Sequence, residues 1–285
     1  MAGTYREEDS AERAALRRAL DDLDALLAAS PERGSGAYLR FEPMVEKLRT
    51  PAAAFLRSEL EERLARYVAA DDYFARDRMA HVLAGSCGQE ALPALLGAMV
   101  TDRNEDGDML HVDILDLFEA WPETAFKLSM DYIASDDPGL RRIGLWGVCF
   151  FDSLGTTYFD LVADAACDPD PGVRADVMAT LGSGFGLGDP PRALDILISG
   201  TSDTAPGVRR AAVSALYGSR EAVVTDALIV CASDADHEVR SWAAWALSRR
   251  PEPEVRAVLE RLTTDEEANV RDAARQALES PTSWF

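Results

Sequence analysis

The stretch DTAPGVRRAAVSALYG, residues 203–218, decides the fold of this chain. An aspartate and a proline open a turn, and apolar side chains then recur at steps of four residues at Val208, Ala212 and Leu216. That spacing places the three side chains on one face of an α-helix, and an acidic side chain at the edge of the turn is suited to cap it. The stretch therefore predicts a short amphipathic helix that buries one face.

The same pattern recurs along the chain. Its other close copies occupy residues 136–148, 168–182, 234–248 and 265–279. Each copy carries an arginine early in the helix, and these arginines lie 33, 35, 31 and 31 residues apart: Arg141, Arg174, Arg209, Arg240 and Arg271. Two weaker copies precede them, residues 71–85 with Arg76 in register and residues 105–118 with Leu110 in place of the arginine. A fixed period of this length indicates a repeat architecture.

A second helix follows in most copies. The expected second helices are residues 89–100, 157–166, 220–232 and 252–262. One such pair cannot bury its apolar face alone, whereas stacked pairs bury a continuous core. The turn aspartates and helix arginines, such as Asp203 and Arg209, are expected to cap helices and to pack neighbouring repeats together, so they are not counted as a functional site.

The stretches DTAPGVRRAAVSAL and DEEANVRDAARQAL resemble the HEAT repeat family, in particular its short PBS lyase HEAT-like subtype. The resemblance covers about residues 71–279. It implies an all-α fold, an α-solenoid in which HEAT-like helix pairs form a right-handed superhelix. Residues 71–285 would hold about seven repeats, the last a half repeat. Residues 1–70 lack the signature, and helices at 10–29 and from Thr50 to about Ala69 predict an N-terminal helical cap.

The composition narrows the classes of partner. Hydrophobic residues make up 47% of the 285 residues, which is typical of a folded protein. Lys and Arg total 29 against 50 Asp and Glu, a net charge of −21. This charge disfavours nucleic acid and anionic membranes, and it favours a basic protein partner. The alternative is that the acidity only improves solubility.

Cellular location is inferred from the N-terminus and the cysteines. No signal-peptide pattern is visible, and no apolar run approaches the length of a membrane span. The four cysteines form no CxxC pair and lie in apolar helical contexts, where burial is expected: Cys87, Cys149, Cys167 and Cys231. We therefore expect a reduced, cytoplasmic protein.

A column of acids offers a candidate partner-binding site. Asp160, Asp195 and Asp226 each lie eight residues before the aspartate that opens the next repeat, and Asp131 and Asp164 lie within a turn of the same column. In HEAT-like solenoids the second helix of each pair lines the concave surface, so the resemblance implies an acidic groove for a basic protein. The alternative is a solvated face, because chance alone places some acids in register in an Asp-rich chain.

The resemblance also brings enzymes into consideration. Deoxyhypusine hydroxylase binds iron through several His-Glu pairs, whereas this chain has three histidines and one such pair, His237-Glu238. Alkylpurine DNA glycosylases use a basic concave face with aromatic residues, at odds with the acidity here. Trp242 and Trp245 hint at such a site, but we expect at least one of them in the core. The glycine-rich segment 183–191 lacks the Lys-Ser/Thr of a P-loop.

The sequence thus favours a non-catalytic protein–protein interaction module whose acidic concave face binds a basic protein. An immunity or inhibitor protein for a toxin or nuclease is the specific form of this hypothesis. A lyase-like or glycosylase-like HEAT enzyme, or a structural or regulatory scaffold subunit, is the alternative. No cofactor, metal, nucleic acid or membrane is expected, and no oligomeric state is predicted. The terminal Trp284 and Phe285 are expected to fold back onto the last helix, with projection to a partner as the alternative.

Overall fold

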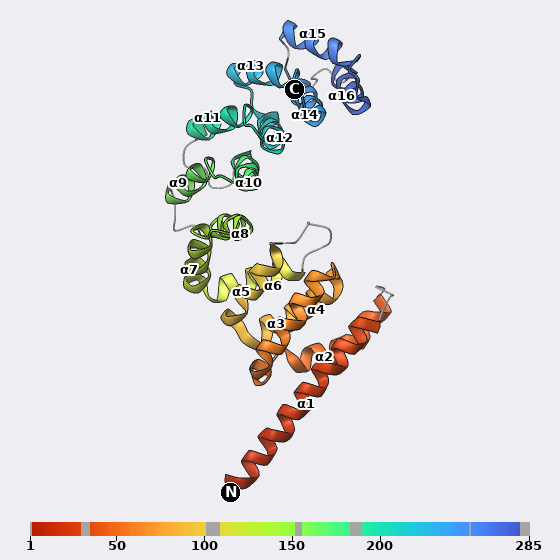
Figure 1. Ribbon diagram of the computed structural model, residues 1–285, viewed down its shortest axis with the longest axis vertical. Coiled ribbons are helices and arrows are strands. Elements are labelled where there is room, and N and C mark those ends of the chain that lie inside the picture. Colours follow the sequence, from red (N-terminus) through yellow and green to blue (C-terminus); the bar gives the residue numbers. More distant parts are fainter. Residues whose placement is uncertain are drawn as a thin grey trace, which may run out of the picture. The chain divides into compact units, whose positions relative to one another are not determined.

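The computed structural model describes residues 2–29, 35–100, 109–151, 156–182, 190–250 and 252–279. All regular secondary structure in these segments is helical, which confirms the predicted all-α solenoid class (Figure 1). The chain divides into two compact units, residues 1–147 and 148–285, which are described one at a time. A boundary between cap and repeats near residue 70 stays a prediction.

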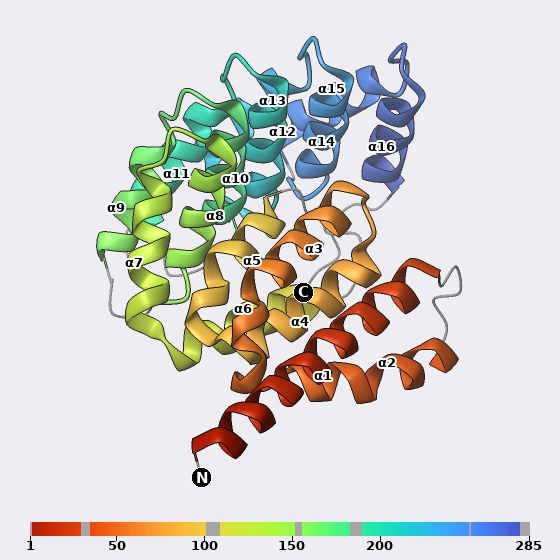
Figure 2. The same ribbon diagram turned by 60° about the horizontal axis from the view of Figure 1, so that its bottom comes forward.

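The first unit contains a long N-terminal helix and the earliest repeat copies. Its elements are α1 (Ala2–Ala29), α2 (Ser35–Leu48), the 3₁₀ helix η1 (Pro51–Leu56), α3 (Arg57–Ala69), α4 (Tyr73–Cys87), η2 (Gly88–Ala91), α5 (Leu92–Met99), α6 (Met109–Ala120), α7 (Pro122–Ile133) and α8 (Pro138–Val148). Helices α1 and α2 pack side by side (Figure 2). Leu20 and Leu23 of α1 are fully buried, because three residues apart they share one face of the helix.

The second unit consists of helix pairs. Its elements are α9 (Thr156–Ala165), α10 (Pro171–Gly182), α11 (Pro190–Gly200), α12 (Pro206–Ala215) with the 3₁₀ helix η4 (Leu216–Gly218), α13 (Ala222–Cys231), α14 (His237–Leu247), α15 (Pro253–Leu262) and α16 (Ala268–Glu279). The predicted core stripe is confirmed, because Val208, Ala212 and Leu216 are all buried, as are Val173 and Leu181. Full burial of each large aliphatic side chain contributes roughly 1.5–3 kcal/mol.

Within the second unit, the two helices of each pair occupy different sides. The first helices α10, α12, α14 and α16 pack tightly against one another in order, whereas contacts between successive second helices are much looser. In Figure 1 the first helices accordingly lie along the inner side of the arc that this unit describes, and α9, α11, α13 and α15 lie along its outer side. The inner surface of the unit is therefore built from first helices.

The turn aspartates play two distinct structural roles. One kind caps the following helix: Oδ1 of Asp170 accepts hydrogen bonds from the backbone N–H of Gly172 and Val173, at 2.8 and 3.1 Å. The other kind opens the turn, as Oδ1 of Asp203 does by accepting from the N–H of Ala205 at 2.8 Å. Both roles satisfy amides that would otherwise lack a partner at the helix start.

The helix arginines join each repeat to the next. Nη1 of Arg209 donates to the backbone carbonyls of Asp203 and Thr204 in its own turn, at 2.9 and 3.3 Å. Its Nε and Nη2 donate to the two carboxylate oxygens of Asp234 in the following repeat, both at 2.7 Å. Such paired N–H···O bonds are the strong, geometrically specific form of an Arg–carboxylate contact.

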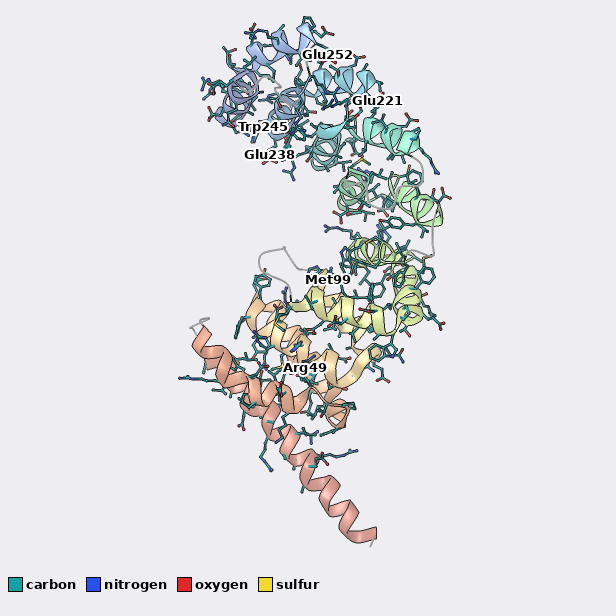
Figure 3. All side chains as sticks on the ribbon, turned by 180° about the vertical axis from the view of Figure 1, so that it is seen from behind. Arg49, Met99, Glu221, Glu238, Trp245 and Glu252 are labelled. Carbon is teal, nitrogen blue, oxygen red and sulfur yellow. The ribbon has the colours of Figure 1, made fainter. Side chains whose placement is uncertain are left out.

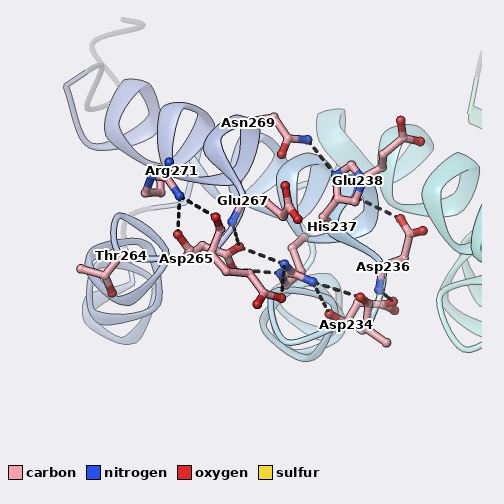
Figure 4. Close-up of polar contacts among 12 residues, drawn as sticks. Asp234, Asp236, His237, Glu238, Thr264, Asp265, Glu267, Asn269 and Arg271 are labelled. Carbon is pink, nitrogen blue, oxygen red and sulfur yellow. Dashed lines mark hydrogen bonds and ion pairs between the residues drawn. The ribbon is translucent and has the colours of Figure 1, made fainter.

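The same arrangement repeats along the inner helices. We call the pairs Arg174–Asp203, Arg209–Asp234 and Arg240–Asp265 the arginine ladder. All six side chains are at most 16% exposed. Figure 4 shows the C-terminal end of the ladder, where Arg271 bonds the carbonyls of its own turn. The predicted packing role is confirmed with a changed pairing, because the carboxylate of Asp203 bonds Arg174 of the preceding repeat rather than Arg209.

Candidate binding surface

The predicted acidic column lies on the second helices. Asp160 on α9, Asp195 on α11 and Asp226 on α13 are all exposed, as is Asp164 on α9. Asp160 is not an isolated charge, because Nη1 of Arg192 donates to its Oδ1 at 2.6 Å. The charge at the column's first position is thereby balanced locally by a neighbouring cation, in an exposed ion pair.

Asp131 belongs to the other unit. It lies on α7 and accepts a hydrogen bond from Nζ of Lys127, four residues earlier on the same exposed helix face.

The acidic column lies on the outer side of the second unit, whereas the concave side was expected. The second helices were expected to line the concave surface, but in the second unit the first helices line the inner side. The physical reason is the arginine ladder together with the close packing of small residues, which draw the first helices together and make their side the shorter one. As a partner contact the column stays a prediction, and it would act from the outer side.

The inner side carries an aromatic hollow instead. Tyr217, Ser241, Trp242 and Trp245 line a cavity of about 440 Å³ between η4 and α14, which we call the aromatic pocket. Trp242 is 41% exposed and Trp245 is 38% exposed. The expectation that at least one of these tryptophans lies in the core is therefore wrong. Figure 3 shows Trp245 and Glu238 on the inner side of this unit, away from Glu221 and Glu252.

Local packing explains why both indoles face solvent. The buried stripe of α14 is completed by Val239, Ala243 and Leu247, at steps of four residues. Trp242 and Trp245 are three residues apart, so they share a second face of the helix. Because the stripe next to the neighbouring helices is filled by alanines and valine, the close approach of α12 and α16 leaves no room for an indole on it.

Charged groups border the aromatic pocket. The guanidinium of Arg249 lies 4.6 Å from the ring centroid of Tyr217, over its face. Arg210 on α12 forms an ion pair with Glu238 on α14, and both side chains are about half exposed. Within the described residues no ring contact or cation contact involves Trp242 or Trp245. Exposed Trp and Tyr side chains flanked by Arg are typical of the residues that dominate binding energy at protein interfaces.

A larger hollow lies in the first unit. It measures about 900 Å³ and is bounded by α3, α5 and α8. Apolar side chains predominate in its wall, among them Ala65, Ala94 and Ala98. Among the described residues no aromatic side chain lines this hollow, so they do not supply there the anchoring groups that the aromatic pocket provides.

The cysteines and histidines have structural surroundings. Burial raises the pKa of the Cys149 and Cys231 thiols to about 11, and it raises the pKa of the Cys87 thiol as well. Cys167 is exposed, which corrects the expectation that all four cysteines are buried. Nδ1 of His237 lies 3.1 Å from the side-chain amide nitrogen of Asn269 (Figure 4).

Two further observations concern only the described part of the chain. It holds no group of three or more His, Cys, Asp or Glu side chains placed to bind a metal ion. None of its helices combines the length and the apolar character that crossing a membrane would take. The glycine-rich residues 183–189 and the terminal Trp284 and Phe285 lie outside the described residues, so the expectations about them stay predictions.

The sequence matches the model of one protein family. A sequence model of HEAT repeats matches residues 129–217 and 194–279, which together make up more than half of the chain. No curated protein sequence matches.

Several solved structures share the fold. The complex of CpcE and CpcF of phycocyanin lyase from Nostoc sp. PCC7120 is 23% identical over 54% of this chain and 97% of that one, with a TM-score of 0.41. Computationally designed armadillo repeat proteins for modular peptide recognition are 13% identical over 76% and 98%, with a TM-score of 0.44. Human deoxyhypusine hydroxylase is 16% identical over 93% and 96%, with a TM-score of 0.36.

Proposed function

Because the chain belongs to the HEAT repeat family, we propose that it is a non-catalytic protein-binding module that contacts its partner through the inner side of residues 148–285. The exposure of Trp242 and Trp245 carries this proposal. Two neighbouring indoles in contact with water cost free energy that a partner recovers when it covers them. A curved stack of first helices presents both rings to one bound segment.

The net charge supports a basic partner. At −21 the chain attracts cationic proteins over distances of about 10 Å at ordinary salt, which speeds their encounter. The exposed Asp160, Asp195 and Asp226, with Asp164 and Asp131, extend this field over the second helices. An inhibitor or immunity protein that captures a basic toxin or nuclease is the specific form of this proposal, and cysteines without CxxC pairs fit action in the reducing cytoplasm.

The chemistry of the thiols supports a non-catalytic role. A nucleophilic cysteine needs a lowered pKa, so that the thiolate is present at neutral pH. Burial has the opposite effect on Cys149 and Cys231, whose pKa values rise to about 11.

A capture experiment tests the proposal. The wild-type chain, the double variant Trp242→Ala/Trp245→Ala and the control Trp121→Ala would each be immobilised and exposed to host lysate at low and high salt. Trp121 is also 38% exposed but belongs to the other unit, so it controls for the loss of a surface indole. We expect one basic protein that the wild type and the control retain and the double variant loses. Equal retention by the double variant, with unchanged circular dichroism, would reject the proposed surface.

A further inference from the structure

Trp242 and Trp245 differ from several half-buried rings, whose faces are covered by guanidinium groups of the chain's own arginines. Arg249 lies over Tyr217 at 4.6 Å and Arg13 lies over Phe55 at 4.9 Å. No such cation covers Trp242 or Trp245 within the described residues. Indole is the best cation–π acceptor among the aromatic side chains, so the strongest acceptors of this surface are the ones left open.

From this difference we propose that the aromatic pocket is a receptor for an arginine side chain of the protein partner. The inference rests on the proposed protein-binding function and names the chemistry of the contact. Tyr217 on η4 and the two tryptophans on α14 supply three rings around one cavity of about 440 Å³. A guanidinium that stacks on an indole keeps its N–H donors in the plane of the group, where they point outward from the ring.

Polar groups lie in the pocket and one helical turn from it. Ser241 lines the pocket with a hydroxyl that accepts hydrogen bonds. Glu238 lies four residues before Trp242, one turn away on the same helix, and its side chain remains 49% exposed while paired with Arg210. A carboxylate accepts several hydrogen bonds at once, so this pair leaves acceptor sites for a second guanidinium.

The net negative charge of the chain also favours an arginine side chain as the ligand. The net charge of −21 raises the local concentration of cationic side chains near the surface. Arginine combines a charge, a planar face for stacking and donors for Ser241 and Glu238, whereas lysine offers only a strongly hydrated point charge.

Peptide titration of the full chain tests the inference. The probes are a capped hexapeptide that contains two arginines and the same peptide with citrulline in their place, which keeps the shape and removes the charge. Binding would be followed by the indole N–H signals in ¹H–¹⁵N spectra at 0.15 M salt. We expect saturable shifts of two indole signals with the arginine peptide, and affinity about three- to tenfold lower with citrulline.

Two substitutions separate stacking from plain attraction and from apolar contact. Trp245→Phe keeps a ring and is expected to weaken arginine binding only slightly, whereas Trp245→Leu keeps an apolar side chain but is expected to weaken it about three- to tenfold. Trp121→Leu is the matched control in the other unit and should change nothing. If Trp245→Leu binds the arginine peptide as tightly as the wild type, or if citrulline binds equally well, the inference is overturned.

The outcomes for the pocket and for the function are distinguishable. Loss of partner capture in the double alanine variant without any arginine preference in the titration would keep the function and reject the arginine receptor. A clear arginine preference in a chain whose partner capture ignores both tryptophans would leave the receptor in place and reject this surface as the site of the proposed function.

Discussion

At the scale of single residues, the arginine ladder supplies ion pairs with little solvent exposure that stabilise the second unit. Arg209→Ala would leave the Asp234 carboxylate, whose side chain is 11% exposed, without its paired donors. A charge stranded at this depth is expected to lower the free energy of unfolding by about 2–3 kcal/mol. Urea denaturation measures this loss. The control is Arg256→Ala, because the Arg256–Glu260 pair is well exposed and its loss should cost at most about 0.5 kcal/mol. Equal losses in both variants would contradict the assigned role.

The ladder also predicts a pH dependence. Hydrogen bonds from Arg174 and Arg240 lower the pKa of Asp203 and Asp265, respectively. Burial alone would raise the pKa of Asp234, but the hydrogen bonds from Arg209 and from the backbone outweigh burial, so this pKa is lowered as well. A lowered folded-state pKa means that the unfolded chain binds protons first. The contribution to stability is therefore complete above the unfolded pKa of about 3.9 and is lost as pH falls through the folded pKa.

The loss of unfolding free energy caused by Asp234→Asn should therefore depend on pH. Asp234→Asn removes the titrating group, so the variant should be clearly less stable than the wild type at pH 7. The gap in the free energy of unfolding should stay constant above about pH 5 and shrink as pH falls below about 3.9 and through the lowered folded-state pKa of Asp234, because protonation then removes the same interaction from the wild type. Urea titrations at four pH values would show this. A gap that stays constant over this range would mean that the carboxylate charge is not what stabilises the pair.

The residue scale also shows where inference from sequence succeeds and fails. The repeated arginines were assigned to packing because their period equals that of the repeat, and the ladder confirms it. The identity of the bonded aspartate was missed, since only three-dimensional stacking reveals that each arginine of the ladder reaches forward to the next repeat. At least one of Trp242 and Trp245 was expected in the core because they lie three residues apart on one helix, but both are exposed. Val239, Ala243 and Leu247 already complete the apolar stripe, and that was the available signal.

At the scale of elements, glycines decide how closely two helices approach. A Cβ on Gly144 of α8 would lie 2.6 Å from the backbone nitrogen of Ile133 and 2.7 Å from the carbonyl oxygen of Ser129, both on α7. These backbone atoms cannot move aside, so Gly144→Ala should destabilise the first unit by about 1–3 kcal/mol. Gly97 of α5 is the internal comparison, because a Cβ there meets no atom within 4 Å.

Gly97→Ala should therefore be neutral or stabilising by up to about 1 kcal/mol, through helix propensity alone. Thermal unfolding of both variants beside the wild type separates the two effects by sign. A loss of similar size in both variants would mean that backbone conformation, rather than the approach of α8 to α7, controls the response.

Elements within the repeats were predictable to within a few residues, whereas those before the repeats were not. The capped turns and the apolar period define both ends of α10 and α14 in the sequence. Helix α2 was missed because Pro43 lies inside it, and an internal proline normally argues against a helix. A helix was expected to start at Thr50, but the segment after Thr50 begins as the 3₁₀ helix η1, and the hydroxyl of Thr50 bonds the carbonyl of Lys47.

At the scale of the whole molecule, charge and surface chemistry separate into different parts of the second unit. Asp160, Asp195 and Asp226 are exposed on second helices, and the aromatic pocket lies among first helices. The sequence could predict that acids share a register, because register follows from the repeat period. It could not predict which side of the stack is concave, since this depends on how closely each set of helices packs.

This separation predicts a kinetic difference between two variants. Changing Asp160, Asp195 and Asp226 to Lys adds two positive charges at each position and brings the net charge from −21 to −15. Charges that do not touch the partner act on encounter, so the association rate with a basic partner should fall about tenfold at low salt while dissociation stays unchanged. The double variant Trp242→Ala/Trp245→Ala should instead dissociate faster at an unchanged association rate, because contact residues act after encounter.

Surface plasmon resonance with the captured partner resolves both rates. In 0.5 M salt the charge variant should become indistinguishable from the wild type, since screening shortens the reach of the field to a few ångström. Faster dissociation of the charge variant would instead place the acidic column in direct contact with the partner, and the bound segment would then have to span both sides of the stack.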